Sequence, residues 1–324
     1  MIERLAICAM GTRFEMALSG ASSPVLRAAG EAAFDEVLHL HRLWSAFDPG
    51  SLLTRVNRLA AGRGVAIDGE TFAILALARE LWEQTQGAFD PTMGGTMRAL
   101  GHRSQGKRSP GKWAQGERDT AGSSREPTPS PGMAAVELDA DLGTVRFLDP
   151  SIELDLGGLA KGVAIDRVGE SLRESGVPCA LVSGGTSSVL AIGTPPDSEG
   201  WPIALDADGK LPCAHLRDVS LGVSAGSGRV AKSIHGLRGH VIDPERGTPA
   251  PLDRWAAVVA DSAAVADAWA TALIATERSL ELPPDFSVLV GGTDGDRSGA
   301  FRPAIIERRQ DPRGVFRSRA ISSP

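Results

Sequence analysis

The 324-residue sequence has few cysteines and no long apolar run, and each shortage narrows its possible functions. No apolar stretch reaches the roughly 18 residues of a membrane span, so we expect a soluble protein without one. Cys8, Cys179 and Cys213 are odd in number and lack C-x-x-C spacing, which predicts neither a disulfide framework nor a cysteine zinc site. No basic stretch followed by an apolar one begins the chain, so as given it is expected to be cytoplasmic; an extracytoplasmic location remains open if the chain has been trimmed.

Positive charge is scarce over most of the chain. Lys and Arg total 34 against 40 Asp and Glu, a net charge of −6. This balance argues against a nucleic-acid binder, which needs a basic surface to displace counterions. Residues 102–132 and 307–324 each carry +3, so the other 275 residues carry −12. A phosphate ligand would therefore be held by a few placed groups or by a metal.

Two segments differ in composition from the rest. Residues 102–132 contain four Pro and five Gly among few apolar residues, so burial cannot offset the entropy cost of ordering them. We predict a disordered, low-complexity surface insertion within one domain that spans 1–306. Residues 307–324 are predicted to form a basic tail.

Apolar periodicity predicts a mixture of helices and short strands. Spacings of three and four residues predict helices after Ser23-Pro24, with Ser23 as N-cap, and over 71–84, 158–174 and 262–276. Short apolar runs predict strands at Leu5–Cys8, Phe14–Leu18, 134–138, 145–148, 152–156, 178–183, 188–192, 201–206, 217–223, 255–260 and 286–290. Grouped strands with a few long helices favour an α+β fold with mixed sheets, built as one compact catalytic unit.

A glycine pair joins a predicted strand to a helix in Asp155-Leu156-Gly157-Gly158-Leu159-Ala160-Lys161. The glycines let the backbone approach a ligand, and Lys161 lies in the first helical turn, where free N–H groups favour an anion. The segment is either a diphosphate seat or an ordinary helix start. It is not a Walker A motif.

The predicted helix over 262–276 carries Asp267 and Thr271 opposite its apolar stripe, with Ala270 nearby. Carboxylate, hydroxyl and carbonyl oxygens are the ligands that Mg²⁺ prefers. A solvated polar face is the alternative, and the surrounding alanines argue against it. The segments Gly87 to Thr92 and His240 to Pro249 carry weaker signals.

Taken in order along the chain, these motifs resemble the ApbE family, the FAD:protein FMN transferases, over about residues 10–290. The matching segments are Met10 to Thr12, Ser45 to Asn57, Gly87 to Thr92, Asp155 to Asp166, Ala180 to Gly193, His240 to Pro249 and Ala266 to Leu273. The resemblance implies a T-fold-like α+β enzyme that requires Mg²⁺. Such an enzyme cleaves FAD, attaches FMN to a Thr or Ser of an acceptor protein and releases AMP.

Phosphoryl-transfer chemistry assigns roles to Lys161 and His240, and the resemblance assigns the FAD and metal positions. Lys161 would neutralise diphosphate oxygens together with the metal, and His240 would take the acceptor proton or only position its loop. The positions that match FAD contacts are Met10, Phe47, Ala88, Phe89, Asp90, Asp155, Lys161, Val241 and Ile242. The positions that match metal ligands are Gly158, Asp267, Ala270 and Thr271.

Some positions depart from the family pattern. Thr186 stands where an acidic residue is usual, Arg246 where Thr is usual, and Phe47 where Tyr is common. Two alternatives share the same motifs: a Mg²⁺-dependent FAD pyrophosphatase and a non-catalytic FAD-binding protein. An RNA-binding arm in the insertion is disfavoured because Trp113 is its sole aromatic residue.

Overall fold

The computed structural model of the protein describes residues 2–102, 129–196, 198–205, 213–228, 230–233, 236–292, 304–310 and 316–322. Most of the predicted insertion, residues 103–128, lies outside these ranges, so its predicted disorder is not addressed. Among the described residues, no helix has both the length and the apolar character needed to cross a membrane.

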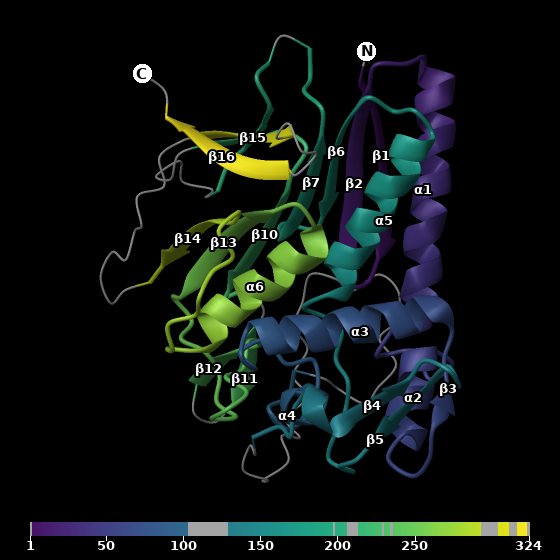
Figure 1. Ribbon diagram of the computed structural model, residues 1–324, viewed down its shortest axis with the longest axis vertical. Helices are drawn as coiled ribbons and strands as arrows, with labels where there is room; N and C mark the ends of the chain where they lie inside the picture. Colours follow the sequence, from purple (N-terminus) through teal and green to yellow (C-terminus); the bar gives the residue numbers. More distant parts are fainter. Residues whose placement is uncertain are drawn as a thin grey trace.

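A seven-stranded sheet organises the molecule, with strand order β1-β2-β6-β7-β10-β13-β14 and every neighbouring pair antiparallel (Figure 1). Its strands are β1 (Ile2–Ala9), β2 (Thr12–Ser19), β6 (Cys179–Gly184), β7 (Ser188–Ile192), β10 (Ser220–Ala225), β13 (Trp255–Ala260) and β14 (Ser287–Gly291). Met10 and Gly11, at φ +49° and +76°, form the tight turn between β1 and β2.

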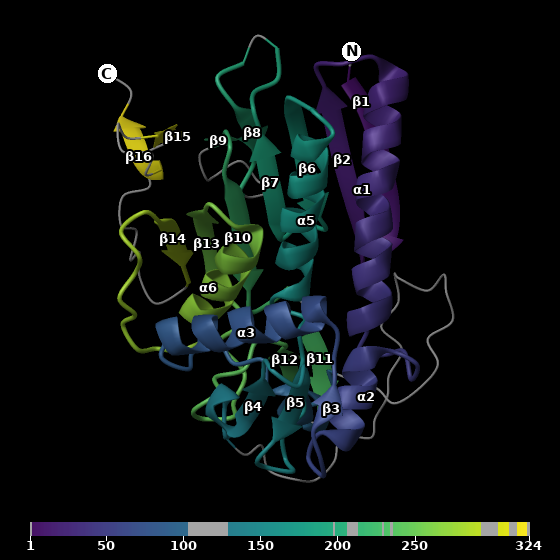
Figure 2. The same cartoon turned by 45° about the vertical axis from the view of Figure 1, so that its right-hand side comes forward.

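The helices pack on the sheet as the apolar pattern predicts. The six α-helices of the described residues are α1 (Ser23–Trp44), α2 (Leu52–Leu59), α3 (Gly69–Gln84), α4 (Gly94–Ala99), α5 (Ala160–Glu174) and α6 (Ala263–Ala275). Figures 1 and 2 show α1, α5 and α6 over one face of the sheet, with α3 crossing beside their ends. Residues of these helices and of the sheet share the main apolar core.

Smaller sheets complete the fold. A three-stranded sheet contains β3 (Val65–Ala66), β5 (Thr144–Phe147) and β4 (Val136–Asp139), which the 3-10 helix η1 (Met133–Ala135) precedes. A hairpin pairs β11 (Val230–Ser233) with β12 (Gly236–Gly239). The third sheet has the order β16 (Phe316–Ser322), β15 (Ala304–Gln310), β9 (Ala214–Leu216), β8 (Trp201–Ile203). The predicted boundary between domain and tail, at 306/307, falls inside β15.

The expectation of an α+β fold with mixed sheets is confirmed, and two local predictions are wrong. Residues 152–156 form no strand; their backbone makes only an isolated bridge between Glu153 and Met93. Ser23 is the first residue of α1 rather than its cap. Its hydroxyl donates instead to Glu3, at 2.8 Å from Oε2.

Helix α6 lies unusually close to the sheet because β10 carries a glycine beneath it. A Cβ placed on Gly222 would come within 2.5 Å of the backbone nitrogen of Asp267. Gly222 pairs with Ser188 on β7, and Ser188 pairs in turn with Gly184 on β6. The inner sheet face beside Ser188 is therefore free of side chains on both neighbouring strands, so a helix backbone can rest against it.

We predict that Gly222→Ala destabilises the fold by about 1–3 kcal/mol, because the new methyl group would force α6 away from β10. Gly69→Ala is the matched control: its Cβ would meet no atom within 4 Å, so we expect no loss and a gain of up to about 1 kcal/mol. Urea unfolding measures both. Equal stability of the Gly222 variant and the wild type would contradict the close approach.

Candidate functional site

The site forms where the N-terminal end of α5 meets α6. Asp166 on α5 accepts hydrogen bonds from the Ser262 hydroxyl (2.7 Å), the Ala263 amide (2.7 Å) and the Ala264 amide (3.0 Å). A carboxylate at the start of α6 satisfies amides that the helix itself leaves unpaired. Gly162 keeps the two backbones close, since its Cβ would lie 2.5 Å from the Ala263 carbonyl oxygen. The two helices are thus fixed relative to each other.

Asp267 is the buried charge of the site. Only 5% of its side chain is exposed, and Lys161 Nζ lies 3.5 Å from its Oδ2. The Ser188 hydroxyl lies 2.8 Å from Oδ1 and 2.6 Å from Oδ2. Burial raises the pKa of Asp267, while Lys161 and Ser188 act in the opposite direction. Lys161 also approaches the Gly157 carbonyl oxygen at 3.5 Å.

The other predicted metal positions lie on or beside α6. The Thr271 hydroxyl donates to the Asp267 carbonyl at 2.9 Å, which leaves its lone pairs available to a cation. A Cβ on Gly158 would lie 3.7 Å from Thr271 Oγ1 and 3.3 Å from the Phe89 ring, so Gly158 borders both residues. Ala270 is fully buried on the same helix. Gly158, Lys161, Asp267 and Thr271 therefore share one neighbourhood.

This donor set suits a hard divalent cation. One carboxylate, one hydroxyl and backbone carbonyls are oxygen ligands of the kind that Mg²⁺ takes. The part of the chain that the structure describes contains no cluster of three or more His, Cys, Asp or Glu residues suited to a metal. A site here would thus depend on Asp267 for its charge, and the metal positions remain predictions.

The loop before α5 is held by groups from two distant segments. Asn57 donates to the Leu154 carbonyl oxygen (2.9 Å) and accepts from the Leu154 amide (2.7 Å). The Asp155 amide donates to the Pro91 carbonyl oxygen at 2.7 Å. The Asp155 carboxylate accepts from the Gly157 amide at 2.7 Å and so shapes the glycine turn. These bonds bring residues 91–94 beside the turn that leads to Gly158.

The remaining predicted FAD positions surround this region from several elements. Ala88 and Phe89 are buried, and half-buried Asp90 accepts from the Thr92 amide (2.8 Å) and hydroxyl (2.6 Å). Burial raises the pKa of Asp90. Phe47 is 62% exposed, although its loop is ordered by the Ser45 hydroxyl.

The predicted contact at Met10 lies in the β1–β2 turn. Its amide donates to His41 Nδ1 on α1 at 3.2 Å, which anchors the turn to the helix. Nothing in the sequence pattern linked these two residues. Only the folded chain therefore brings His41 next to Met10, a predicted FAD contact.

The segment after β12 packs against the C-terminal end of α6. Val241 shares a buried cluster with Ile274 and Ala275, and Ile242 shares another with Met93. His240 is half-buried beside Gly228, whose Cβ would lie 3.4 Å from the imidazole Cε1. The role of His240 as a base stays a prediction.

The two unusual residues named from the sequence differ in their surroundings. Arg246 is paired with Glu277 just beyond α6, with Nη1 2.9 Å from Oε2, so it ties its turn to the helix end. Thr186 is exposed between β6 and β7. Two residues further along, Ser188 is the buried partner of Asp267, and the sequence patterns did not single it out.

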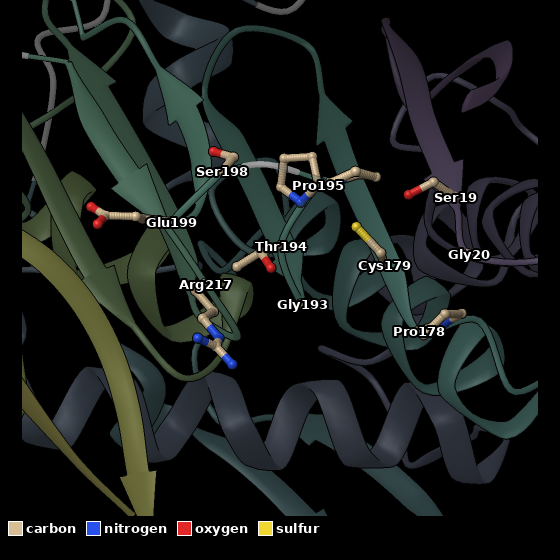
Figure 3. A pocket seen from close by; sticks show the side chains of 11 residues that line it. Ser19, Gly20, Pro178, Cys179, Gly193, Thr194, Pro195, Ser198, Glu199 and Arg217 are labelled. Atoms are coloured by element: carbon tan, nitrogen blue, oxygen red, sulfur yellow. The ribbon is translucent and has the colours of Figure 1, made fainter. Parts of the chain in front are cut away.

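A cavity of about 720 Å³ lies elsewhere in the molecule (Figure 3). Its lining includes Ser19, Cys179 and Gly193, at the ends of β2, β6 and β7 opposite to Gly184 and Ser188. Burial raises the pKa of the Cys179 thiol, which disfavours its thiolate form. The cavity is separate from the predicted site.

Comparisons with known proteins agree with the site's motifs. A family model described as "ApbE family" matches residues 10–282. Proteins named FAD:protein FMN transferase are similar at 28% identity in Rhodobacter capsulatus, over 81% of this chain and 49% of that protein. The Chlamydia muridarum protein of the same name is 27% identical over 72% of each chain. The chain thus spans about half of the first relative's length.

Solved structures share the fold. A Thermotoga maritima ApbE protein superposes with a TM-score of 0.70 at 23% identity, covering 84% of this chain and 86% of that one. The apo form of Pseudomonas stutzeri flavinyl transferase ApbE gives 0.67 at 24% identity, covering 85% and 84%. The resemblance inferred from the motifs and the expected fold are confirmed.

We predict that Mn²⁺ or Mg²⁺ raises the melting temperature of the wild type, because a ligand that binds only the folded state stabilises it by about 2.7 kcal/mol at a hundred times its Kd. Asp267→Asn should abolish this shift, since it removes the only carboxylate among the predicted ligands. Glu277→Gln, at an exposed position just beyond the same helix, should retain it. A full shift in the Asp267 variant would exclude Asp267 as a ligand.

Proposed function

Because the chain belongs to the ApbE family, we propose that it is an FAD:protein FMN transferase that requires Mg²⁺. It attaches FMN from FAD to a threonine or serine of an acceptor protein and releases AMP. The observation that carries the proposal is the buried Asp267 carboxylate on α6 beside Lys161 of α5, with Gly158 bordering Thr271 on the same α6. The relatives' shared name supports the same reaction.

The reaction is a phosphoryl transfer between two oxygens. The acceptor hydroxyl oxygen bonds to the FMN-side phosphorus of FAD, and the bond from that phosphorus to the AMP-side bridging oxygen breaks. AMP leaves with the bridging oxygen, and the hydroxyl proton passes to a base. Such transfers depend on positioning and charge neutralisation more than on covalent machinery.

Several residues of the chain fit these needs. Lys161 supplies a positive charge in the first turn of α5, a helix whose N-terminus has no side-chain cap and whose dipole favours phosphate oxygens. A divalent cation bound at Asp267, Thr271 and the carbonyls of Gly158 and Ala270 would neutralise further diphosphate charge. This local positive charge matters because the chain outside its basic insertion and tail has a net charge of −12.

The flavin and the acceptor are served by different parts of the site. Phe47 offers an exposed ring for a planar ligand, and the apolar residues at the other matching positions, Ala88, Phe89, Val241 and Ile242, are buried. His240 is proposed to accept the proton of the attacking hydroxyl. The proposed acceptor is a protein with a suitable Thr or Ser.

The direct test incubates the chain with FAD, Mg²⁺ and a flavinylation-domain peptide. We expect AMP and flavinylated peptide to form in equal amounts, and the peptide mass to rise by that of the FMN moiety. Neither product should form when the peptide's acceptor Thr is replaced by Ala. AMP without a mass gain would identify an FAD pyrophosphatase instead. Bound FAD without AMP would identify a non-catalytic binder.

His240→Ala is expected to lower the transfer rate by about 10²- to 10⁴-fold, the usual contribution of a general base. FAD binding should stay within a few-fold of the wild type, as measured by flavin fluorescence. His215→Ala, on β9 in the separate sheet, is the matched control and should keep the full rate. A near wild-type rate for His240→Ala would show that another group takes the proton.

A further inference from the structure

Ser188 has an unusual position for a hydroxyl. It is the first residue of β7, fully buried, and hydrogen-bonded to strands on both sides. Its pairing partners on the inner face are Gly184 and Gly222, neither of which has a side chain. A buried hydroxyl needs a partner, because an unsatisfied one costs about 1–3 kcal/mol.

The partner is the carboxylate of Asp267, 79 residues away in the sequence. The hydroxyl oxygen is 2.8 Å from Oδ1 and 2.6 Å from Oδ2, so it lies between the two carboxylate oxygens. The single hydroxyl proton can be donated to either oxygen, and the position of Oγ determines how the plane of the carboxylate is turned. The terminal torsion of an aspartate has no sharp preference of its own, so this contact supplies the missing restraint.

The backbone around the pair is rigid on both sides. Gly222 allows the 266–267 backbone of α6 to rest on the sheet, and Asp166 holds the first turn of α6 against α5. Lys161 approaches Asp267 Oδ2 at 3.5 Å. Ser188 thus supports the carboxylate from the sheet, while the predicted ligands Gly158 and Thr271 border each other at the start of α5 and on α6.

We propose that Ser188 is a positioning residue that orients the Asp267 carboxylate toward a divalent cation. The inference rests on the proposed function for its metal requirement. Groups that hold a metal ligand in place commonly change metal affinity by about 10- to 100-fold when removed. Ser188 itself is not a ligand in this scheme, because its hydroxyl is used by Asp267.

The test measures Mn²⁺ affinity directly, by the electron paramagnetic resonance signal of free Mn²⁺, with no FAD or acceptor present. Ser188→Ala is expected to raise the Mn²⁺ Kd by about 10- to 100-fold, while metal-free FAD binding stays unchanged. Ser220→Ala is the matched control: Ser220 is equally buried on the adjacent strand, but its hydroxyl points to the Asp261 carbonyl oxygen at 3.5 Å. Its Mn²⁺ Kd should stay within about twofold of the wild type.

Two results would overturn the proposal. One is an unchanged Mn²⁺ Kd in Ser188→Ala, even if the melting temperature falls, because that would show a purely structural role. The other is an equal loss of affinity in both serine variants. If Ser188→Ala does not fold, Ser188→Cys keeps the volume but weakens the donor, and the same Kd comparison applies. The Mn²⁺ measurement does not involve FMN transfer. If the separate transfer assay gave no AMP, that result would count against the proposed function but not against the role of Ser188.

Discussion

The arrangement of α5, α6 and the central sheet depends on one buried carboxylate, Asp267, and its polar partners. Asp267 lies between α6 and the central sheet, where burial raises its pKa and works against the charged form. A lysine from α5 and a hydroxyl from β7 act in the opposite direction. Neither group is near Asp267 in the sequence, so the site exists only when helix, helix and strand are all in place.

Small residues make that arrangement possible. Gly222 lets the backbone of α6 touch the sheet, and Gly162 lets α5 approach the start of α6. Asp166 then links the two helices by satisfying the first amides of α6. These contacts bring the backbones of α5, α6 and β10 close together. The chemistry then depends on the few side chains held in this frame.

The distribution of charge along the chain also bears on the proposed site. An acidic chain is a poor host for a diphosphate unless positive charge is concentrated where the ligand binds. In the proposed function, Lys161 at the start of α5 would provide that concentration, and the oxygen donors on α6 would suit a cation. Arg246 is a second positive side chain near the end of α6, and it is paired with Glu277. The net charge of −6 averages these unlike regions.

The sequence by itself determined the α+β class, the helices over 158–174 and 262–276 and the motifs that carry Asp267, Thr271 and Lys161, because periodicity and motif order are local properties. It misplaced 152–156 as a strand: an apolar run does not reveal that Asn57 and Pro91 will hold its backbone as a loop. It also could not single out Ser188 or His41. Their partners lie 79 and 31 residues away, and hydrogen bonds across such distances are chosen by packing. Only the tertiary structure decided how the Asp267 carboxylate is turned, since that orientation comes from a strand and a helix meeting across a glycine.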